Sequence, residues 1–238
     1  MNQEVLSLLT DADKVLIGIG ESFERKDEEL NTEEFKLLER ENPLLAGFQR
    51  LEYWKTHPEQ SVINAYNDLY ELVQNKDYFI VTTCTDDRIY KSNFSEDKIV
   101  APCGTRRYLQ CSELCMEELL PVSDEMIEKK EMIYCPHCGN RVSFNLVSCE
   151  KYNEQGYISQ WIAYRNWLQR TINQKICIIE LGVGMKYPTI IRWPFEKIAY
   201  CNNKASFIRV HNYLYQITEE LSGKGISVEA DPIKFLLE

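Results

Sequence analysis

The chain has 238 residues, of which 44% are hydrophobic, and a formal net charge of −10 at pH 7. This length suits one large domain with a small insert. The acidic balance argues against nucleic acid as a partner, because proteins that bind it usually present a basic face to the phosphates. No stretch approaches the roughly 20 uninterrupted apolar residues that a membrane span needs, so we expect no membrane partner.

The segment from Met1 to Asp13 lacks the basic region and apolar run that mark a signal peptide. The nine cysteines are an odd number, and four of them form two close pairs. Disulfides are the less favoured use of cysteine in a chain without a secretion signal, whereas close pairs are typical of metal ligands. The sequence therefore predicts a cytoplasmic protein that binds a metal.

Short apolar segments that end in glycine or polar turns predict four buried strands. Strands without polar alternation are typical of a parallel sheet that is covered on both faces. Helical patterns separate the strands, which predicts an α/β fold with a doubly wound, Rossmann-like sheet. The predicted strands are 14–20, 78–83, 176–181 and 206–211, and the predicted helices lie near 5–9, 62–73, 157–172 and after Asp231-Pro232.

The cysteine module predicts a small zinc-ribbon domain at 104–145. Cys111-x3-Cys115 is followed, after nineteen residues, by Cys135-Pro-His-Cys138-Gly139. Four thiolates suit tetrahedral Zn²⁺ in a structural site, and His137 is a competing ligand within the second pair. The alternative is two unrelated pairs of reduced cysteines.

The remaining segments, 1–103 and 146–238, form the predicted dinucleotide-binding domain. Residues 23–60 are charged and contain several aromatic side chains, so we expect a packed helical excursion or lid there. In parallel sheets, ligands bind beyond the carboxyl ends of the strands. The residues that follow each predicted strand are therefore the candidates for a ligand site.

The run Gly18-Ile-Gly20-Glu-Ser22 follows the first predicted strand. Glycines there allow backbone N–H groups to approach a phosphate, although such a run also occurs in a tight turn that binds nothing. Glu21 is unfavourable beside a phosphate, so it either contacts ribose hydroxyls or points to solvent.

The order of these features resembles that of the sirtuin (Sir2) family of NAD-dependent deacylases and ADP-ribosyltransferases. The glycine run comes first, then a strand that ends in Thr-Thr-x-x-Asp, a Cys-Gly step, the four cysteines, a glycine turn with Tyr-Pro, and a strand that ends in Asn. The segments Glu180–Gly184 and Tyr108–Cys111 resemble the divergent bacterial branch, which includes transferases that act on protein side chains.

The resemblance implies roles for individual residues. Gly18, Gly20 and Ser22 look like the loop that holds the NAD pyrophosphate, and Asp86 is similar to the aspartate that positions the nicotinamide ribose. Asn212 resembles the asparagine that contacts the adenosine ribose, and the four cysteines match the family's zinc ligands. The full set of implied NAD contacts is Gly18, Gly20, Glu21, Ser22, Thr83, Asp86, Gly182, Val183, Gly184 and Asn212.

The departures from the family pattern bear on catalysis. The family's Gln-Asn pair is Thr83-Cys84 here, and its catalytic histidine is Cys103, before Gly104. The candidate catalytic residues are therefore Asp86, Cys84 and Cys103. The two thiols are either a reactive pair, with Cys103 activated by the neighbouring arginines, or small buried apolar side chains.

Deacylation needs a general base, and this sequence lacks the family's catalytic histidine. ADP-ribosyl transfer needs fewer catalytic groups in the site. We therefore expect an NAD-dependent ADP-ribosyltransferase that acts on a protein side chain. The alternatives are a catalytically inactive NAD or ADP-ribose sensor or scaffold and, third, an NAD-dependent protein deacylase.

Overall fold

Six parallel strands form the central sheet of the computed structural model, which describes residues 3–238. Their order is β3-β2-β1-β7-β8-β9, and every neighbouring pair is parallel. The predicted doubly wound α/β fold is confirmed. The strands are β1 (Lys14–Ile19), β2 (Asp77–Thr82), β3 (Ile99–Val100), β7 (Ile176–Leu181), β8 (Ala205–His211) and β9 (Gly225–Glu229).

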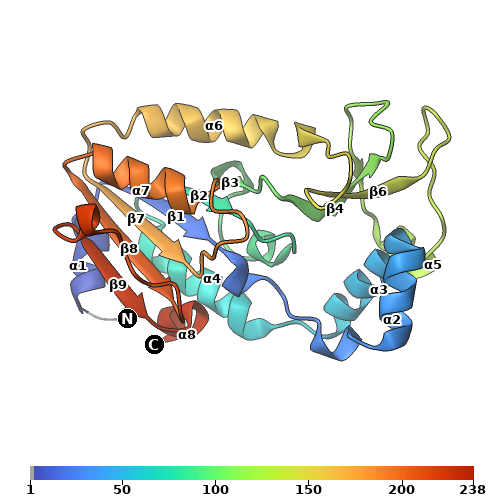
Figure 1. Cartoon of the computed structure of the whole chain (residues 1–238), viewed down its shortest axis with the longest axis horizontal. Coiled ribbons are helices and arrows are strands. Elements are labelled where there is room, and N and C mark those ends of the chain that lie inside the picture. The colour runs from blue at the N-terminus through green and yellow to red at the C-terminus, as the bar shows by residue number, and fades with distance from the viewer. Residues whose placement is uncertain (1–2) are drawn as a thin grey trace.

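Helices cover both faces of this sheet (Figure 1). Along β1, Val15 and Ile17 face the core cluster with α1, α4 and α8, whereas Leu16 faces the cluster with α6 and α7. This alternation buries both faces, which explains the continuous apolar runs in the sequence. The helices are α1 (Gln3–Asp11), α2 (Glu33–Glu41), α3 (Pro43–Thr56), α4 (Gln60–Val73), α5 (Asp124–Lys129), α6 (Ile158–Gln169), α7 (Arg192–Cys201) and α8 (Pro232–Leu237).

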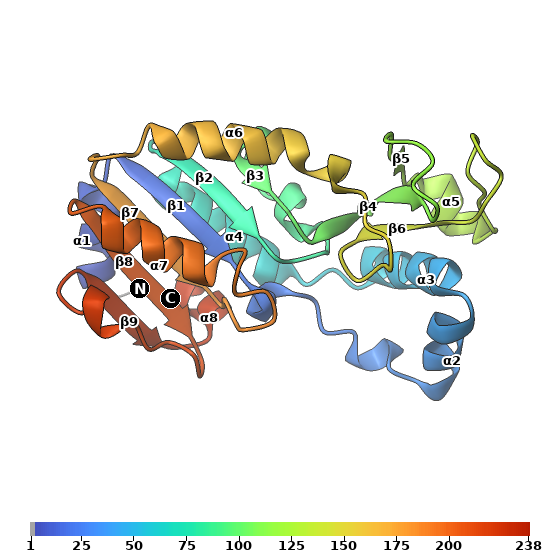
Figure 2. The same cartoon turned by 45° about the horizontal axis from the view of Figure 1, so that its top comes forward.

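A second, antiparallel sheet in the order β5-β4-β6 lies at the other end of the molecule (Figure 2). Its strands are β4 (Gly104–Cys111), β5 (Leu120–Pro121) and β6 (Val142–Leu146). A separate core cluster joins this sheet to α3, through Phe48, Trp54 and Phe144 among others. The expected helical excursion at 23–60 is therefore present, and α3 packs against the cysteine module.

The predicted strands all occur, with ends that differ by one residue or none. Two strands of the central sheet were not predicted: β3, which has two residues, and β9, which is partly exposed and carries no continuous apolar run. The helix α7 was not predicted either. Asp231 accepts hydrogen bonds from the N–H groups of Ile233 and Lys234, so it is the predicted N-cap of α8. No helix within residues 3–238 is long and apolar enough to cross a membrane.

Candidate nucleotide and metal sites

Four loops leave the carboxyl ends of β2, β1, β7 and β8, which are consecutive neighbours in the sheet. Because the strands are parallel, these loops lie along one edge. The loop after β1 contacts the loop after β2, since the Cys84 thiol donates to the Gly20 carbonyl at 3.3 Å. It also contacts the loop after β7, since the Ser22 N–H donates to the Gly182 carbonyl at 3.1 Å.

The glycines of the first loop are required by close packing. A Cβ on Gly20 would lie 2.3 Å from both the Gly182 oxygen and the Val183 Cα. Gly182 itself has a φ of +63°, a conformation that glycine adopts without strain. Gly18 lies within β1, where a Cβ would lie 2.5 Å from Ile191. Gly18 therefore allows α7 to pack on the sheet, and its predicted contact with NAD stays a prediction.

Glu21 bridges the loops after β1 and β7. Its carboxylate accepts hydrogen bonds from the N–H groups of Gly184, at 2.7 Å, and Lys186, at 3.0 Å. These two N–H groups therefore point toward an anion, as a phosphate-binding loop requires. A second feature fits a bound nucleotide, because the Thr83 hydroxyl is buried and has no hydrogen-bond partner among the residues that the structure describes. An unsatisfied buried hydroxyl at this edge suits a polar group of a ligand.

The two thiols in the candidate site are both buried. Burial raises the pKa of Cys84 well above its usual value and the pKa of Cys103 to about 12. The Glu24 carboxylate raises both values further. Both thiols are therefore protonated near neutral pH, and a thiol in that state is a poor nucleophile. A catalytic role for either cysteine stays a prediction.

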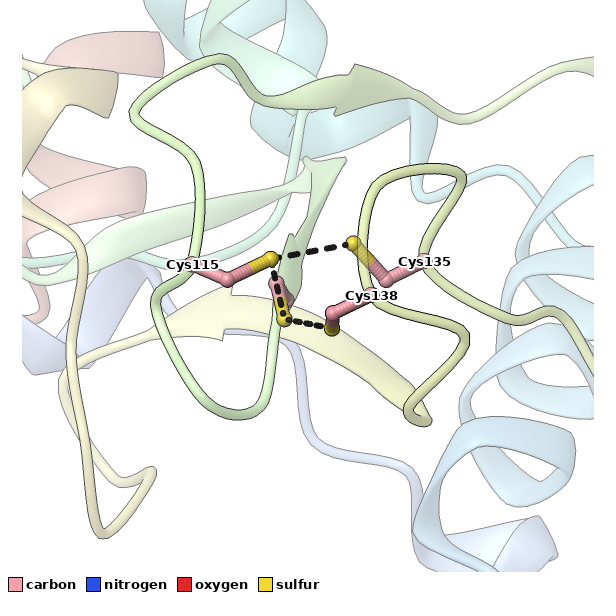
Figure 3. A group of neighbouring side chains, drawn as sticks. Cys115, Cys135 and Cys138 are labelled. Carbon is pink, nitrogen blue, oxygen red and sulfur yellow. Dashed lines mark hydrogen bonds between the residues drawn. The ribbon is translucent and has the colours of Figure 1, made fainter.

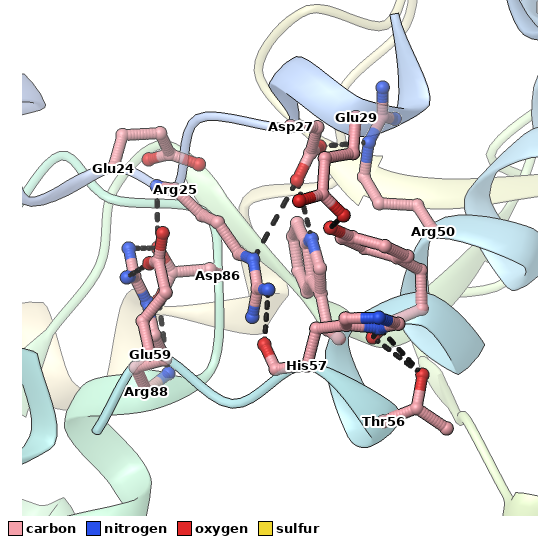
Figure 4. A network of polar contacts seen from close by, with 12 residues as sticks. Glu24, Arg25, Asp27, Glu29, Arg50, Thr56, His57, Glu59, Asp86 and Arg88 are labelled. Carbon is pink, nitrogen blue, oxygen red and sulfur yellow. Dashed lines mark hydrogen bonds and ion pairs between the residues drawn. The ribbon is translucent and has the colours of Figure 1, made fainter.

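Asp86 is buried at the end of the loop after β2 and is held by Arg88 (Figure 4). The Arg88 guanidinium donates to both Asp86 carboxylate oxygens, at 3.1 and 2.7 Å. The backbone N–H of Arg25 donates to the same carboxylate at 3.3 Å, and Arg88 also contacts the carbonyl of Phe23 and the carboxylate of Glu59. Asp86 thus has a fixed orientation and ties the first loop to the second.

Glu24 is a carboxylate in this site that sequence reasoning missed. It accepts hydrogen bonds from the Thr85 N–H at 2.8 Å and the Thr85 hydroxyl at 2.7 Å. Burial, and then the charge of Asp86, raise its pKa from the usual value, while the bonds from Thr85 oppose the increase. No local motif marks Glu24, because its partner is far along the chain.

The rest of the lid segment is fixed by polar contacts with α3 (Figure 4). Asp27 accepts hydrogen bonds from Arg50 and from the indole N–H of Trp54, both at 2.6 Å. The Arg25 guanidinium donates to the His57 carbonyl at the end of the helix. The lid is therefore attached to the part of the molecule that carries the cysteines.

Asn212 follows β8, and two contacts fix the loop that contains it. His211 Nδ1 accepts hydrogen bonds from the N–H groups of Tyr213, at 3.0 Å, and Leu214, at 3.1 Å. Arg192 donates to the carbonyls of Val183 and Leu214, at 3.0 Å each, and so joins the loops after β7 and β8. The fold thus brings the loops with Gly20, Asp86 and Asn212 to a single edge of the sheet.

Four cysteine sulfurs converge on the second sheet (Figure 3). The Sγ atoms of Cys111, Cys115, Cys135 and Cys138 all lie within 4.8 Å of one another, and neighbouring pairs are 3.4 to 3.5 Å apart. Zn–S bonds of about 2.3 Å in a tetrahedron give comparable separations, so the cluster fits a structural zinc ion. His137 Nδ1 lies 3.4 Å from the Cys115 sulfur, as a neighbour of the cluster. The predicted grouping of cysteines is confirmed.

Solved structures that share one fold superpose on nearly the whole chain. A Sir2 protein bound to an acetylated peptide superposes with a TM-score of 0.60 at 13% identity, over 100% of this chain and 96% of that chain. A Sir2–p53 peptide–NAD⁺ complex gives a TM-score of 0.58 at 14% identity, again over 100% and 96%. This chain has the sirtuin fold. An ADP-ribose complex of a Sir2 homologue gives a TM-score of 0.58 at 12% identity, over 99% and 94%.

Two curated relatives of this sirtuin-like chain have names that refer to ADP-ribose. The "Protein ADP-ribosyltransferase" of Staphylococcus aureus (strain Mu50 / ATCC 700699) is 23% identical over 265 residues, which covers 96% of this chain and 84% of that protein. The "Probable bifunctional ADP-ribose hydrolase/ADP-ribosyltransferase" of Fusarium oxysporum f. sp. cubense is 24% identical over 57% of this chain, and the match spans only 26% of that protein. No family model matches the chain.

Proposed function

We propose that this sirtuin-like protein binds NAD and transfers ADP-ribose to a side chain of a protein. The observation that carries the proposal is the alignment of 96% of the chain with a relative named as a protein ADP-ribosyltransferase. Sirtuins of the same fold are described in complexes with NAD⁺, ADP-ribose and peptides. These descriptions support a dinucleotide and a protein segment as the two substrates.

The candidate site has groups that suit NAD. The loop after β7 supplies two N–H groups for an anion, and these now bond to Glu21. The Thr83 hydroxyl is left without a hydrogen-bond partner by the described residues, so it can bond to a ligand. Asp86 lies in the same loop and is oriented by Arg88. We assign the pyrophosphate to the loops with Gly20 and Gly184, and the ribose hydroxyls to Thr83 and Asp86.

Glu24 is the group that we assign to proton transfer. When bound, NAD supplies an ADP-ribosyl group whose nicotinamide is the leaving group. The acceptor side chain must lose a proton as it bonds to the ribose carbon, and Glu24 is a carboxylate held within the site to accept it. Its raised pKa brings it closer to neutral, which improves a general base. Thr85 fixes the orientation of this carboxylate.

The structure offers less support for deacylation. The position of the family's catalytic histidine is Cys103, whose thiol is protonated near neutral pH. The three histidines of the chain lie elsewhere. His57 is exposed at the end of α3, His137 adjoins the cysteine cluster, and His211 bonds to the loop after β8.

The test uses the full zinc-loaded chain and NAD labelled in the nicotinamide ring. We expect nicotinamide release with transfer of an ADP-ribosyl mass to a protein acceptor. Asp86→Asn should abolish release, whereas Asp97→Asn, at an exposed carboxylate, should leave it unchanged. Saturable NAD binding without release would instead support the sensor, and absence of binding at millimolar NAD would overturn both functions.

Three further predictions stay proposals. We propose that the chain resides in the cytoplasm and uses neither nucleic acid nor a membrane as partner, in keeping with its net charge of −10. We also propose the division into a dinucleotide-binding domain at 1–103 and 146–238 and a zinc domain at 104–145. Limited proteolysis after removal of zinc tests that division, because cleavage should then concentrate within 104–145 and spare the rest of the chain.

A further inference from the structure

A second cavity lies apart from the candidate nucleotide site. It has a volume of about 450 Å³ and is bordered by α3, β4, β5, α5 and the turn of 3-10 helix at Arg88–Lys91. These elements belong to the zinc-bearing end of the molecule, except for that turn (Figure 2). Its charged lining consists of four basic side chains, Lys55, Lys91, Arg106 and Arg107, and two carboxylates, Asp87 and Asp124.

Three of these basic groups have a carboxylate partner. Lys55 pairs with Asp124, Lys91 pairs with Asp87, and Arg107 pairs with Glu96. Arg106 differs from them. Within residues 3–238 its guanidinium forms no hydrogen bond and no ion pair, and its Nε is fully buried.

The Arg106 guanidinium is held between aromatic rings. Its Cζ lies 5.5 Å from the ring centroid of Phe144 and 5.9 Å from that of Trp54. The residue's backbone is also fixed, because its N–H donates to the Thr85 carbonyl at 3.0 Å.

Burial, and then the charge of nearby Arg50, lower the pKa of Arg106 to about 10, so it stays charged near neutral pH. The carboxylates of Glu24, Asp27 and Glu39 oppose this decrease, but none of them forms an ion pair with Arg106. A buried charge without a direct counter-ion is costly, and an anion in contact with it would relieve that cost.

One part of the cavity wall is apolar. Leu51, Val122 and Ile127 line it, and Trp54 contributes an aromatic ring. A guanidinium binds a planar carboxylate or a phosphate through two parallel hydrogen bonds. An apolar wall beside it suits a hydrocarbon or aromatic body attached to that anionic group.

We propose that this cavity is a binding site for a small organic anion, in which Arg106 binds a carboxylate or phosphate and the apolar wall binds the attached body. Its lining shares no residue with the contacts that we assign to NAD, although Arg106 adjoins Thr85 of that site. The anion site depends neither on the proposed transferase activity nor on the identity of the acceptor.

The probes are phenyl phosphate and benzoate, with phenol and inorganic phosphate as partial probes. Binding to the full zinc-loaded chain is measured by calorimetry. We expect one binding site for phenyl phosphate or benzoate, with weaker binding of both partial probes. Equal affinity for inorganic and phenyl phosphate would overturn the assignment of the apolar wall, and no binding of either organic anion at millimolar concentration would overturn the site.

Arg106→Gln removes the charge, and Arg165→Gln removes an exposed arginine on α6 as a matched control. A charge-assisted hydrogen bond of roughly 1.5 to 3 kcal/mol corresponds to a loss of about tenfold or more in affinity. We expect that loss with Arg106→Gln and none with the control. Equal affinity of the Arg106→Gln protein and the unmodified protein would overturn the proposal.

A second variant tests the proposal independently, in case Arg106→Gln does not fold. Val122 is only partly buried, so Val122→Glu places a carboxylate in the cavity wall at small cost to the fold. That carboxylate should pair with Arg106 and exclude the organic anion, and retained affinity would contradict the proposal. Excess ADP-ribose should leave phenyl phosphate binding unchanged, because competition would place the anion in the nucleotide site instead.

Discussion

The carboxylate of Glu24 accepts two hydrogen bonds from Thr85, one from its N–H and one from its hydroxyl. This contact joins the loop after β1 to the loop after β2 directly beside Asp86. It orients a carboxylate of raised pKa in the site where we expect the acceptor. The same pair thus joins the two loops and orients the carboxylate that we propose as the base.

Glu24→Gln should retain NAD binding and lose transfer. The amide keeps a carbonyl acceptor for Thr85 but cannot take a proton, so we expect the rate of ADP-ribosyl transfer to fall by about 10² or more. Rates at saturating NAD measure this, and the NAD affinity should change little. Glu28→Gln, at an exposed carboxylate in the same segment, is the control. A Glu24→Gln protein with normal turnover would show that another group accepts the proton.

Gly20→Ala should destabilise the protein. The added Cβ would overlap the Gly182 carbonyl and the Val183 backbone, which cannot move aside as a flexible side chain would. We expect a loss of about 1 to 3 kcal/mol in the free energy of unfolding, measured by denaturant titration. Gly223→Ala meets no atom within 4 Å and should change that free energy by less than about 0.5 kcal/mol. Equal stability of the two variants would exclude tight packing at Gly20.

Cys135→Ser should remove one zinc ion per chain. The cluster supplies four thiolates, and loss of one weakens a structural site whose binding energy also stabilises the surrounding fold. Metal analysis should give about one zinc per chain before the change and much less after it, with faster proteolysis near the second sheet. Cys201→Ser, at an exposed cysteine, should retain the metal. Full zinc content in the Cys135→Ser protein would rule out this residue as a ligand.

Glu180 should make stability depend on pH. It is buried in β7, where its Oε2 lies 2.6 Å from the Arg209 Nε, and its Oε1 has no hydrogen-bond partner within residues 3–238. Burial raises its pKa from 4.5 to about 7, although Arg209 opposes this. The folded protein therefore binds a proton that the unfolded chain releases, so stability should fall as pH rises from 4.5 to 7.

The measurement is the thermal midpoint across that pH range for the natural protein and for Glu180→Gln. The variant lacks the titrating group, so its midpoint should fall less steeply. Parallel curves for the two proteins would mean that Glu180 is ionised at the same pH in the folded and unfolded states.

The alternation of strand patterns and helix patterns along the sequence was enough to predict the sheet. Its four central strands are mostly apolar, because both faces are covered, and each apolar run can be found without knowledge of its neighbours. The edge strands β3 and β9 escaped prediction because one is too short and the other is partly exposed. The glycines were visible too, but the structure shows that Gly18 and Gly20 satisfy packing requirements that sequence alone could not reveal.

The clustering of four cysteines and the parallel strands could be predicted from local patterns, since both depend on spacing within short segments. The environments of Glu24, Arg88 and Arg106 arise only in the folded chain. Glu24 meets a residue 61 positions away, and Arg88 contacts Glu59 and Phe23. Among residues 3–238, Arg106 forms no ion pair, whereas each of the other three cations of the cavity has one. Such contacts arise when distant loops meet, and no local pattern records them.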